Sequence, residues 1–423
     1  MALKNYEADM VRCSRCSYCK WVPTLKLDVR FSNVCPAIAR YNFHAYSAGG
    51  KLAAGLAFLR ERFDYSDGLL DIIYKCQVDG ACDAMCKVNM ELELLETMLE
   101  FRAKCVEDGQ LLPAHLAVIE SLRKEDNMMQ RPKAERGKWA EGLDVKDLTR
   151  EKAEVVYYAG CSLSFDEELW KVSRGMVTLL KNAGVDVGIM GREEACCGGR
   201  AYEMGYQGEL TTYAEHNMEM FKAAGVKMLV AGCSDCYQAF KVLYHKIGKK
   251  LDIEVLHITE YLDRLIKEGK IRLTKEVPMT VTYHDPCHLG RLGEPWIPWK
   301  GVEKKVLGQI ILHDPPKEFR RGRNGIYEPP REVLRSIPGL RLVEMKRIKE
   351  YAWCCGAGGG VKEAYPDFAT WTAGERMEEA KSTGAEALVT ACPWCERNFN
   401  DAIKERGDGI KVYDVIELVQ QAI

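Results

Sequence analysis

The sequence predicts a mostly helical N-terminal region followed by a duplicated α/β region, so the chain combines α+β and α/β character. Residues 91–107 and 113–124 carry apolar side chains at three- and four-residue spacing, the period of amphipathic helices. From Glu154 onward, short apolar runs alternate with helical patterns, as in α/β domains. One cysteine pattern in this second region occurs twice, which indicates an internal duplication. A length of 423 residues fits two or three domains.

The N-terminal region is expected to end near residue 130. Residues 131–152 are rich in Lys, Glu and Gly and contain Pro132, so we interpret them as a linker. Cys105 lies alone within the first predicted helix, where a cysteine usually serves as a small buried apolar residue.

Cysteines follow the predicted strands of the α/β region. In the first copy, strands at 155–159 and 228–231 end at Cys161 and Cys233, with a helix at 167–182 and a strand at 185–190 between them. In the second copy, strands are expected at 281–283, 342–345 and 387–390. Open α/β sheets usually place their sites at the carboxyl ends of strands, so these cysteines are candidate site residues.

The distances along the chain between equivalent cysteines define the repeat. Cys196 to Cys354 is 158 residues and Cys233 to Cys392 is 159, but Cys161 to Cys287 is only 126. The second copy therefore carries about 32 extra residues near 292–323, by comparison of the copies. The expected halves are 153–275 and 276–423. The insertion contains two tryptophans and an Arg-rich run, which fit a docking surface or a packed flap equally well.

Composition excludes several classes of protein. The net charge is −2, from 60 basic and 62 acidic residues, so a nucleic-acid binder is not expected. No apolar stretch approaches the roughly 20 residues that span a bilayer, and the first ten residues contain no apolar signal region. We therefore expect a cytoplasmic protein that meets a membrane only through partners. Eighteen cysteines in such a chain favour metal or redox chemistry over a disulfide framework.

The first two cysteine groups fit a pair of iron–sulfur clusters. Two-cluster bacterial ferredoxins carry C-x2-C-x2-C-x3-C-P, in which the last cysteine serves the other cluster. The first group has the triplet followed, after fifteen residues, by Cys-Pro. The second group has aspartate at the second cysteine position and Lys after the last. The groups are Cys13, Cys16, Cys19 and Cys35, then Cys76, Asp79, Cys82 and Cys86.

Crossed ligation assigns Cys13, Cys16, Cys19 and Cys86 to one cubane cluster and Cys35, Cys76 and Cys82 to the other. The fourth ligand of the second cluster is Asp79 or absent. Because a carboxylate is harder than a thiolate, this site is expected to hold a labile iron or a 3Fe–4S cluster. Asp79 also fits a plain turn residue in Val-Asp-Gly. Two zinc sites are the alternative, but zinc favours closed four-ligand sets and rarely a C-x2-C-x2-C triplet.

The ten remaining cysteines form two copies of one motif. In the first, 34 residues separate Cys161 from the pair Cys196-Cys197. Gly198 follows the pair, and 35 residues, Gly198 included, separate the pair from Cys233-x2-Cys236. The second copy has gaps of 66 and 36 residues and comprises Cys287, Cys354-Cys355-Gly356, Cys392 and Cys395. These motifs match the CCG signature of heterodisulfide-reductase-like proteins. Together with the N-terminal module, the whole chain resembles their D-type subunits.

The resemblance implies one non-cubane 4Fe–4S cluster per half, held by all five cysteines of that half. From the residues themselves, five thiolates exceed a zinc tetrahedron, adjacent cysteines suit bridging of neighbouring irons, and the following glycine lets the backbone approach closely. One structural zinc per half is the alternative. No flavin is expected in this chain, because its Gly-rich runs follow cysteine pairs and do not open a G-x-G-x-x-G helix after a strand.

Two histidines flank Cys287. His284 and His288 occupy the places that Tyr158 and Ser162 hold in the first copy. They have the chemistry to protonate a leaving thiolate or to tune a cluster, but structural hydrogen bonding is the favoured role. No catalytic residue is assigned.

The resemblance implies two functions of different classes. The opening cysteine triplet, the long gap to Cys35-Pro36, the stretch 41–50 and the decorated second copy are similar to the D-type component of class II benzoyl-CoA reductase complexes. This implies an electron-transfer subunit of a large anaerobic complex that uses flavin-based electron bifurcation. Its partners would include a flavin-bearing heterodisulfide reductase A-like subunit, a tungsten protein and other redox subunits. The alternative is the catalytic subunit of a thiol-disulfide (heterodisulfide-type) reductase, paired with a membrane cytochrome.

Overall fold

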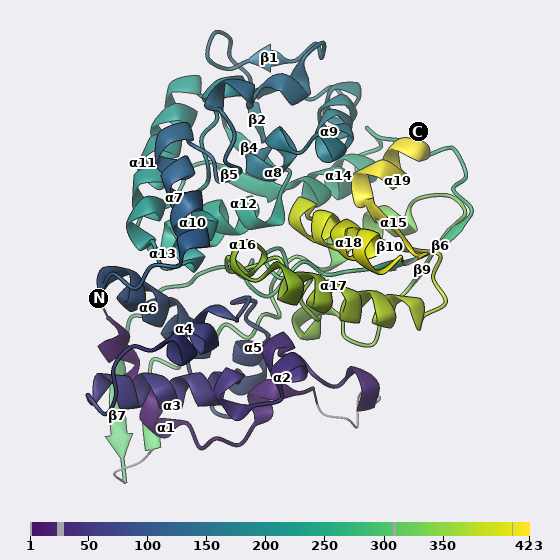
Figure 1. The fold of residues 1–423 in the computed structure, drawn as a ribbon. Helices are drawn as coiled ribbons and strands as arrows, with labels where there is room; N and C mark the ends of the chain where they lie inside the picture. The colour runs from purple at the N-terminus through teal and green to yellow at the C-terminus, as the bar shows by residue number, and fades with distance from the viewer. Residues whose placement is uncertain (1, 23–28, 308–309, 408) are drawn as a thin grey trace.

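The computed structural model describes residues 2–22, 29–307, 310–407 and 409–423. A helical N-terminal module and two α/β halves pack against one another (Figure 1). One large core of buried apolar side chains runs through all three parts, from Leu3 to Ala422. Cys233 of the first half and Cys392 of the second lie where the two halves meet.

The N-terminal module is built from short helices. Its helices are α1 (Glu7–Arg12), α2 (Pro36–Tyr41), α3 (Ala48–Leu59), α4 (Asp67–Tyr74), α5 (Ala81–Lys87), α6 (Leu94–Glu107) and α7 (Pro113–Glu125), with a 3₁₀ turn, η2 (Tyr18–Lys20). Helices α6 and α7 confirm the two helices predicted from apolar spacing. Pro36 and Pro113 stand in the first turns of α2 and α7, where a missing backbone N–H costs nothing. Cys105 is fully buried within α6, as expected.

The first half contains a parallel sheet. Its strands are β1 (Lys146–Asp147), β2 (Val155–Tyr158), β3 (Val187–Ile189), β4 (Met228–Ala231) and β5 (Glu254–His257), in the order β1-β3-β2-β4-β5. Its helices are α8 (Gly160–Phe165), α9 (Trp170–Asn182), α10 (Gly199–Glu203), α11 (Gln207–Ala224), α12 (Ser234–Gln238), α13 (Tyr244–Lys246) and α14 (Ile258–Lys267). Strand β2 is buried along its whole length, which explains its unbroken apolar run.

The second half repeats this sheet. Its strands are β6 (Met279–Tyr283), β9 (Leu340–Val343), β10 (Ala387–Thr390) and β11 (Lys411–Asp414). Their parallel order β9-β6-β10-β11 is that of β3-β2-β4-β5, so the predicted duplication is confirmed. Its helices are α15 (Glu328–Arg335), α16 (Val361–Ala364), α17 (Pro366–Lys381), α18 (Pro393–Arg406) and α19 (Val415–Gln421). The strand expected at 342–345 begins two residues earlier.

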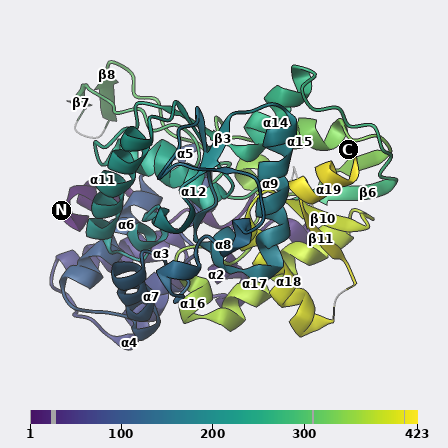
Figure 2. The same ribbon diagram turned by 90° about the horizontal axis from the view of Figure 1, so that it is seen from above.

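Two segments differ from a simple repeat. The stretch predicted as a linker, 131–152, packs on the first half: it supplies strand β1 and buries Trp139 and Leu148. Within the 292–323 insertion, strands β7 (Val302–Val306) and β8 (Ile310–Asp314) form an antiparallel hairpin that stands away from the body (Figure 2). Ion pairs from Arg321 to Glu91 and from Lys317 to Glu93 tie the insertion to the N-terminal module.

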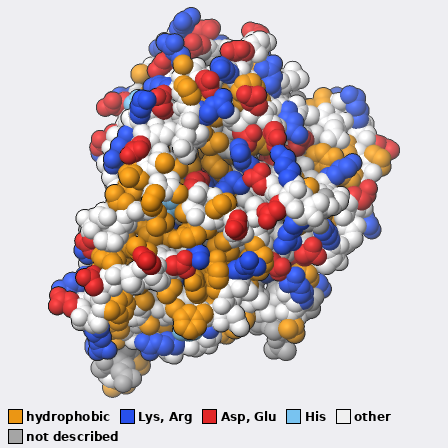
Figure 3. Space-filling model, in the orientation of Figure 1, with side chains coloured by type: hydrophobic (Ala, Val, Ile, Leu, Met, Phe, Trp, Pro, Cys, Tyr) orange, Lys and Arg blue, Asp and Glu red, His pale blue; other side chains and the backbone are white. Residues whose placement is uncertain are grey.

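Hydrophobic and charged side chains are distributed unevenly over the surface. In the face shown in Figure 3, hydrophobic side chains gather over the N-terminal helices, whereas charges of both signs are scattered over the upper part. Among the described residues, no helix combines the length and the apolar character that crossing a bilayer requires.

Candidate iron–sulfur sites

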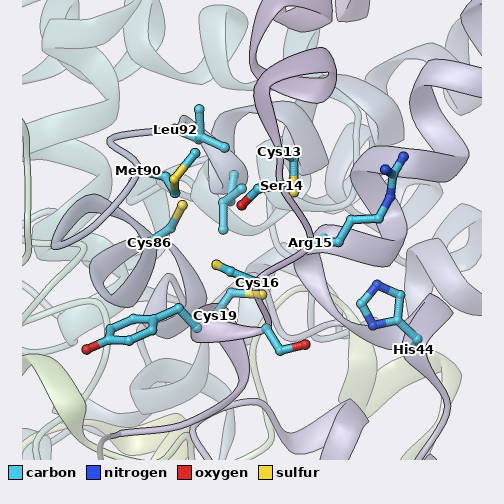
Figure 4. A pocket seen from close by; sticks show the side chains of 13 residues that line it. Cys13, Ser14, Arg15, Cys16, Cys19, His44, Cys86, Met90 and Leu92 are labelled. Carbon is cyan, nitrogen blue, oxygen red and sulfur yellow. The ribbon is translucent and has the colours of Figure 1, made fainter.

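Four cysteines from two groups surround one pocket of the N-terminal module. Cys13 follows α1, Cys19 lies in η2 and Cys86 comes from α5, and their sulfur atoms converge with that of Cys16 (Figure 4). Arg15 and Ser17 adopt left-handed backbone conformations, with φ of 55° and 68°, which wrap the triplet around the pocket. Cys16 is exposed, whereas Cys19 and Cys86 are buried. We call this the outer site.

The outer site leaves room for a group between its sulfurs. A Cβ on Gly49 would lie 3.6 Å from the Cys13 sulfur, an ordinary van der Waals distance, so the Gly49 backbone borders this sulfur directly. Burial raises the pKa of Cys86 to about 12 and that of Cys19 above its usual range. The metal-free thiols of Cys19 and Cys86 are thus protonated at neutral pH, and binding of a cluster to them releases protons.

Three further cysteines line a second pocket with a carboxylate. Cys35 precedes α2, Cys76 follows α4 and Cys82 lies in α5, and Asp79 completes the ring. The Asp79 side chain is 7% exposed. Its Oδ1 accepts a hydrogen bond from the Ala81 backbone at 3.0 Å, but its buried Oδ2 has no hydrogen-bond donor. Three thiols and a buried carboxylate in one lining fit an iron–sulfur cluster. We call this the inner site.

Helix α5 joins the outer and inner sites. It supplies Cys82 to one and Cys86 to the other, four residues apart and hence on one helix face. Burial, and then Cys76, Cys35, Asp79 and Cys19, raise the pKa of Cys82 well above its usual range. Because one helix of seven residues carries a cysteine of each site, the two sites are neighbours.

An arginine of the second half reaches the inner site. Arg291 follows Cys287 by four residues, and its Nη2 lies 3.3 Å from Asp79 Oδ2, in a pair that is almost fully buried. Arg291 also donates to the carbonyls of Asp79 and Ala352. A hydrogen bond with Cys287 lowers the pKa of Cys354, but Cys355, burial and then Asp79 together raise it well above the usual range. This pair therefore lies between the inner site and the CCG cysteines of the second half.

The five CCG cysteines of the first half form one buried cluster of thiols. Cys161 begins α8 after β2, the pair Cys196-Cys197 follows β3, and Cys233 and Cys236 start α12 after β4. None is more than 6% exposed. Hydrogen bonds with Cys196 and Cys236 lower the pKa of Cys197 to about 5. A thiolate in the middle of this group is thus stabilised by its neighbours even without metal.

Arg136 and Glu194 form the polar surroundings of this first CCG site. Arg136 Nη2 lies 3.4 Å from the Cys161 sulfur, and its Nη1 pairs with Glu194 at 3.0 Å. Glu194 also accepts hydrogen bonds from the backbone of Ala159 and Gly160. Burial raises the pKa of Glu194 to about 7, against the opposing effect of Arg136.

The second half gathers its cysteines in the same way. Cys287 follows β6, Cys354 and Cys355 follow β9, and Cys392 and Cys395 start α18 after β10. Hydrogen bonds with Cys354 and Cys395 lower the pKa of Cys355 to about 6, as in the first half. The structure therefore brings together each set of five that the motif predicts.

The two CCG sites meet at their α12 and α18 ends. Cys233, Asp235 and Cys392 place their ligand atoms within 4.8 Å of one another. Ser234 Oγ donates to the Ala391 carbonyl at 2.8 Å across the same junction. The two sites are thus in direct contact through one cysteine of each.

His288 connects the halves beside this junction. Its Nε2 lies 2.5 Å from Glu203, and its Nδ1 lies 3.1 Å from Asp235 and 3.3 Å from the Cys287 sulfur. Burial alone lowers its pKa, but Asp235 and Glu203 outweigh burial and raise it well above the usual range. His288 is therefore a cation that binds two carboxylates of the other half.

His284 has a different environment. Its Nδ1 accepts a hydrogen bond from Arg376 at 3.2 Å, which leaves the proton on Nε2. Burial, and then Arg376, lower the pKa of His284 to about 3, so the ring is neutral. A ring nitrogen of His284 lies within 4.8 Å of the Cys355 and Cys395 sulfurs.

Arg136, Glu194, Asp235 and Arg291 are site residues that motif analysis missed. Asp235 lies inside the C-x2-C motif and Arg291 four residues beyond Cys287, so their spacing carried a signal. Arg136 lies in a charge-rich stretch with no motif, and only the fold brings it to Cys161.

Comparison with known proteins agrees with these sites. A 4Fe–4S dicluster domain model matches residues 9–90, and a cysteine-rich CCG domain model matches residues 155–241 and 312–400. The EtfAB:quinone oxidoreductase of Syntrophomonas wolfei is 29% identical over 84% of this chain and 47% of its own length. FadF of Bacillus subtilis, a probable iron-sulfur-binding oxidoreductase, is 28% identical over 89% of this chain and 52% of its own length.

Relatives of matching length give the family. The D-type component of the dihydromethanophenazine:CoB–CoM heterodisulfide reductase of Methanosarcina acetivorans is 32% identical over 98% of this chain and 94% of its own. Its counterpart from Methanosarcina mazei is 31% identical over the same shares. The chain is thus an iron–sulfur oxidoreductase subunit, and it belongs to the family of heterodisulfide reductase D-type subunits.

Proposed function

We propose that this chain is an electron-transfer subunit that carries electrons from the outer site to the inner site, then to the second CCG site and finally to the first. Its clusters, when bound, supply one-electron redox centres. The observation that carries the proposal is that each site in this series lies close to the next, with helix α5 carrying a cysteine of both N-terminal sites. Cys19 adjoins Cys82, the Arg291–Asp79 pair adjoins Cys354, and Cys392 adjoins Cys233.

The cysteine sets described above are the proposed ligands. The outer site would hold a cubane 4Fe–4S cluster, and each CCG site a non-cubane 4Fe–4S cluster. At the inner site, the place of Asp79 in one lining with three cysteines supports a carboxylate ligand to iron, and Arg291, 3.3 Å from Oδ2, balances its charge. No flavin is assigned to this chain.

For the assembly, we propose the class II benzoyl-CoA reductase type, with a flavin-bearing heterodisulfide reductase A-like partner and electron bifurcation. Its support is the sequence resemblance of the N-terminal stretch and the decorated second copy. Burial of all ten CCG cysteines favours relay over attack on a free substrate.

Disulfide reduction is the second candidate. The observation that favours it is the meeting of the two CCG sites at Cys233 and Cys392, which places two redox centres on either side of one point. In this case a membrane cytochrome would supply the electrons.

Anaerobic purification of the native complex through a tag on this chain separates the candidates. Tungsten-protein and flavin subunits in one assembly support relay in a ring-reducing complex. A membrane cytochrome b, or a small cysteine-tailed protein, supports disulfide reduction. Iron should approach roughly sixteen per chain if all four sites hold four irons. Substantial zinc would contradict the proposed clusters.

Asp79→Cys tests the inner site. The variant completes a four-cysteine set, so we expect a clean four-iron signal by EPR in place of a labile or three-iron signal. Asp79→Asn is the control, because it keeps the shape and removes the charged ligand. An unchanged spectrum in both variants contradicts ligation by Asp79.

A further inference from the structure

The outer site opens to solvent on one side. Cys16 is exposed, and it is the only exposed cysteine among those of the described residues. The inner site is lined by Lys51 and Met98 beside three cysteines that are only partly exposed, and the CCG sites are buried. Under the proposed function, an electron from another protein has its shortest route into this chain at Cys16.

The rim of this opening is positively charged. Between Met10 and Trp21 the chain carries Arg12, Arg15 and Lys20 and no acidic residue. Lys20 and Arg15 both lower the pKa of His44, after burial, so these cations lie close to that ring. In Figure 4, Arg15 and His44 extend on the same side of the pocket.

These cations differ from those nearby. Arg60 pairs with Glu7, and Lys87 is held between Asp83 and Glu93. For Arg12, Arg15 and Lys20, no ion pair is found within the described part of the chain. Arg12 lies near Asp9 and opposes the rise that burial causes in the pKa of that carboxyl, but no acidic residue forms an ion pair with these three cations in the described residues. Positive charge around an opening attracts a partner of opposite charge and accelerates its docking.

Exposed apolar side chains lie among the charges. Val11, Tyr18 and Phe43 are 54%, 37% and 63% exposed. Tyr18 lines the outer site, Val11 lies two residues before Cys13 and Phe43 precedes His44. A few apolar contacts within a charged rim suit a small, transient interface, such as those of electron-transfer encounters.

We propose that this surface, comprising Val11, Arg12, Arg15, Cys16, Tyr18, Lys20, Phe43 and His44, docks a small acidic electron-carrier protein. The proposal rests on the proposed function, since it requires a cluster at the outer site. One electron leaves the reduced centre of the carrier, which becomes oxidised by one electron, and the outer cluster is reduced by one. Carboxylates of the carrier pair with the arginines and Lys20, and its apolar centre packs on Tyr18.

Stopped-flow reduction of the purified holoprotein tests this surface. The probe is a pre-reduced acidic 2Fe–2S ferredoxin, mixed anaerobically at several salt concentrations. The variant is Arg12→Glu/Lys20→Glu, which leaves Arg15 intact because it lines the cluster pocket. The matched control is Arg272→Glu/Lys275→Glu, two exposed cations on the connection between the halves, for which no ion pair is recorded among the described residues.

For the wild type we expect a second-order rate constant that falls as salt rises. The surface variant should be slower by about tenfold at low salt and lose this dependence, and the control should match the wild type. Reduction by methyl viologen, together with iron content and EPR, is measured on every sample. If the wild-type protein lacks a cluster at the outer site, the proposed function is overturned, because electrons then have no entry centre and the rates of wild type and variant cannot be compared.

Two results overturn the docking proposal alone. The first is an intact, viologen-reducible cluster whose reduction by ferredoxin is equal in wild type and surface variant. The second is that the wild type sediments with phosphatidylserine vesicles and the surface variant does not, while both are reduced by ferredoxin at the same rate. That result would assign the cations to a membrane surface.

Discussion

The two α/β halves share a strand order and a five-cysteine motif, but their polar surroundings differ. In the first half, Cys161 faces Arg136 and Glu194, both supplied by its own sheet and the stretch packed on it. In the second, Arg291 reaches Asp79 in the N-terminal module, and His288 reaches Glu203 and Asp235 in the first half. Duplication thus preserved the cysteine sets, while the second half acquired contacts with both neighbours.

This difference gives the halves different places in the proposed relay. The second half contacts the inner site on one side and the first CCG site on the other. The first CCG site has no such contact with the cysteine-bearing loops of the N-terminal module, among the residues described; helices α6 and α7 pack on this half instead, through Arg102 and Leu122. In the proposed relay, the CCG site of the second half is therefore the intermediate redox centre, and that of the first half is the final one.

The largest expected effect comes from removing one CCG cluster at a time. Cys355→Ala should lose about four irons and also stop rapid reduction of the first CCG site, because electrons arrive through the second half. Cys197→Ala should also lose about four irons, but the second CCG site should still be reduced rapidly. Rapid-freeze EPR after mixing with reductant distinguishes them. Equal kinetics of the surviving CCG cluster in both variants would contradict the order of the sites.

Removal of the two buried arginines compares the polar surroundings directly. Arg291→Met leaves the buried Asp79 carboxylate without its ion-pair partner, and the carbonyls of Asp79 and Ala352 without their donor. We therefore expect a loss of about 3–5 kcal/mol in the free energy of unfolding. Arg136→Met should cost less at pH 6 than at pH 8, because Glu194, with a pKa of about 7, can take up a proton when its partner is removed. Denaturant unfolding at both pH values measures this. A loss that is the same for both variants and independent of pH would refute the distinction.

Glu194→Gln tests the first half alone. The pKa of Glu194 is raised from 4.5 to about 7, so the folded state binds its proton more tightly than the unfolded state does. Its contribution to stability is complete below pH 4.5 and is lost as pH rises to 7, a change of about 2–3 kcal/mol. The glutamine variant should lack this part of the pH dependence. The comparison needs unfolding free energies at pH 5 and pH 7.5, and identical slopes for variant and wild type would count against it.

The sequence predicted the features that depend on short-range pattern. Apolar runs located β4 and β10 to the residue, and motif spacing grouped the cysteines as the fold later did. Strand β1 escaped prediction because two residues, Lys146 and Asp147, carry no apolar pattern and pair only through backbone contacts with β3. The Arg291–Asp79 pair escaped because it joins residues 212 positions apart, and only tertiary packing specifies such a contact.

The smallest expected effect concerns the insertion that decorates the second half. Arg321 pairs with Glu91 at 2.8 Å, but both side chains are about a third or more exposed. Arg321→Ala should therefore lower stability by less than about 1 kcal/mol and leave the iron content unchanged. A loss comparable with that of Arg291→Met would mean that the insertion, rather than the Arg291–Asp79 pair, fixes the second half on the module.

If the outer and inner sites hold the proposed clusters, helix α5 couples the assembly and the oxidative loss of the two. Because Cys82 and Cys86 lie one turn apart on a helix of seven residues, neither ligand can withdraw without unwinding the segment that holds the other. Oxygen that reaches the exposed Cys16 side and dismantles the outer cluster therefore weakens the inner one as well. Insertion of the first cluster, conversely, orders the helix that receives the second, so the two are expected to be assembled and repaired as a pair.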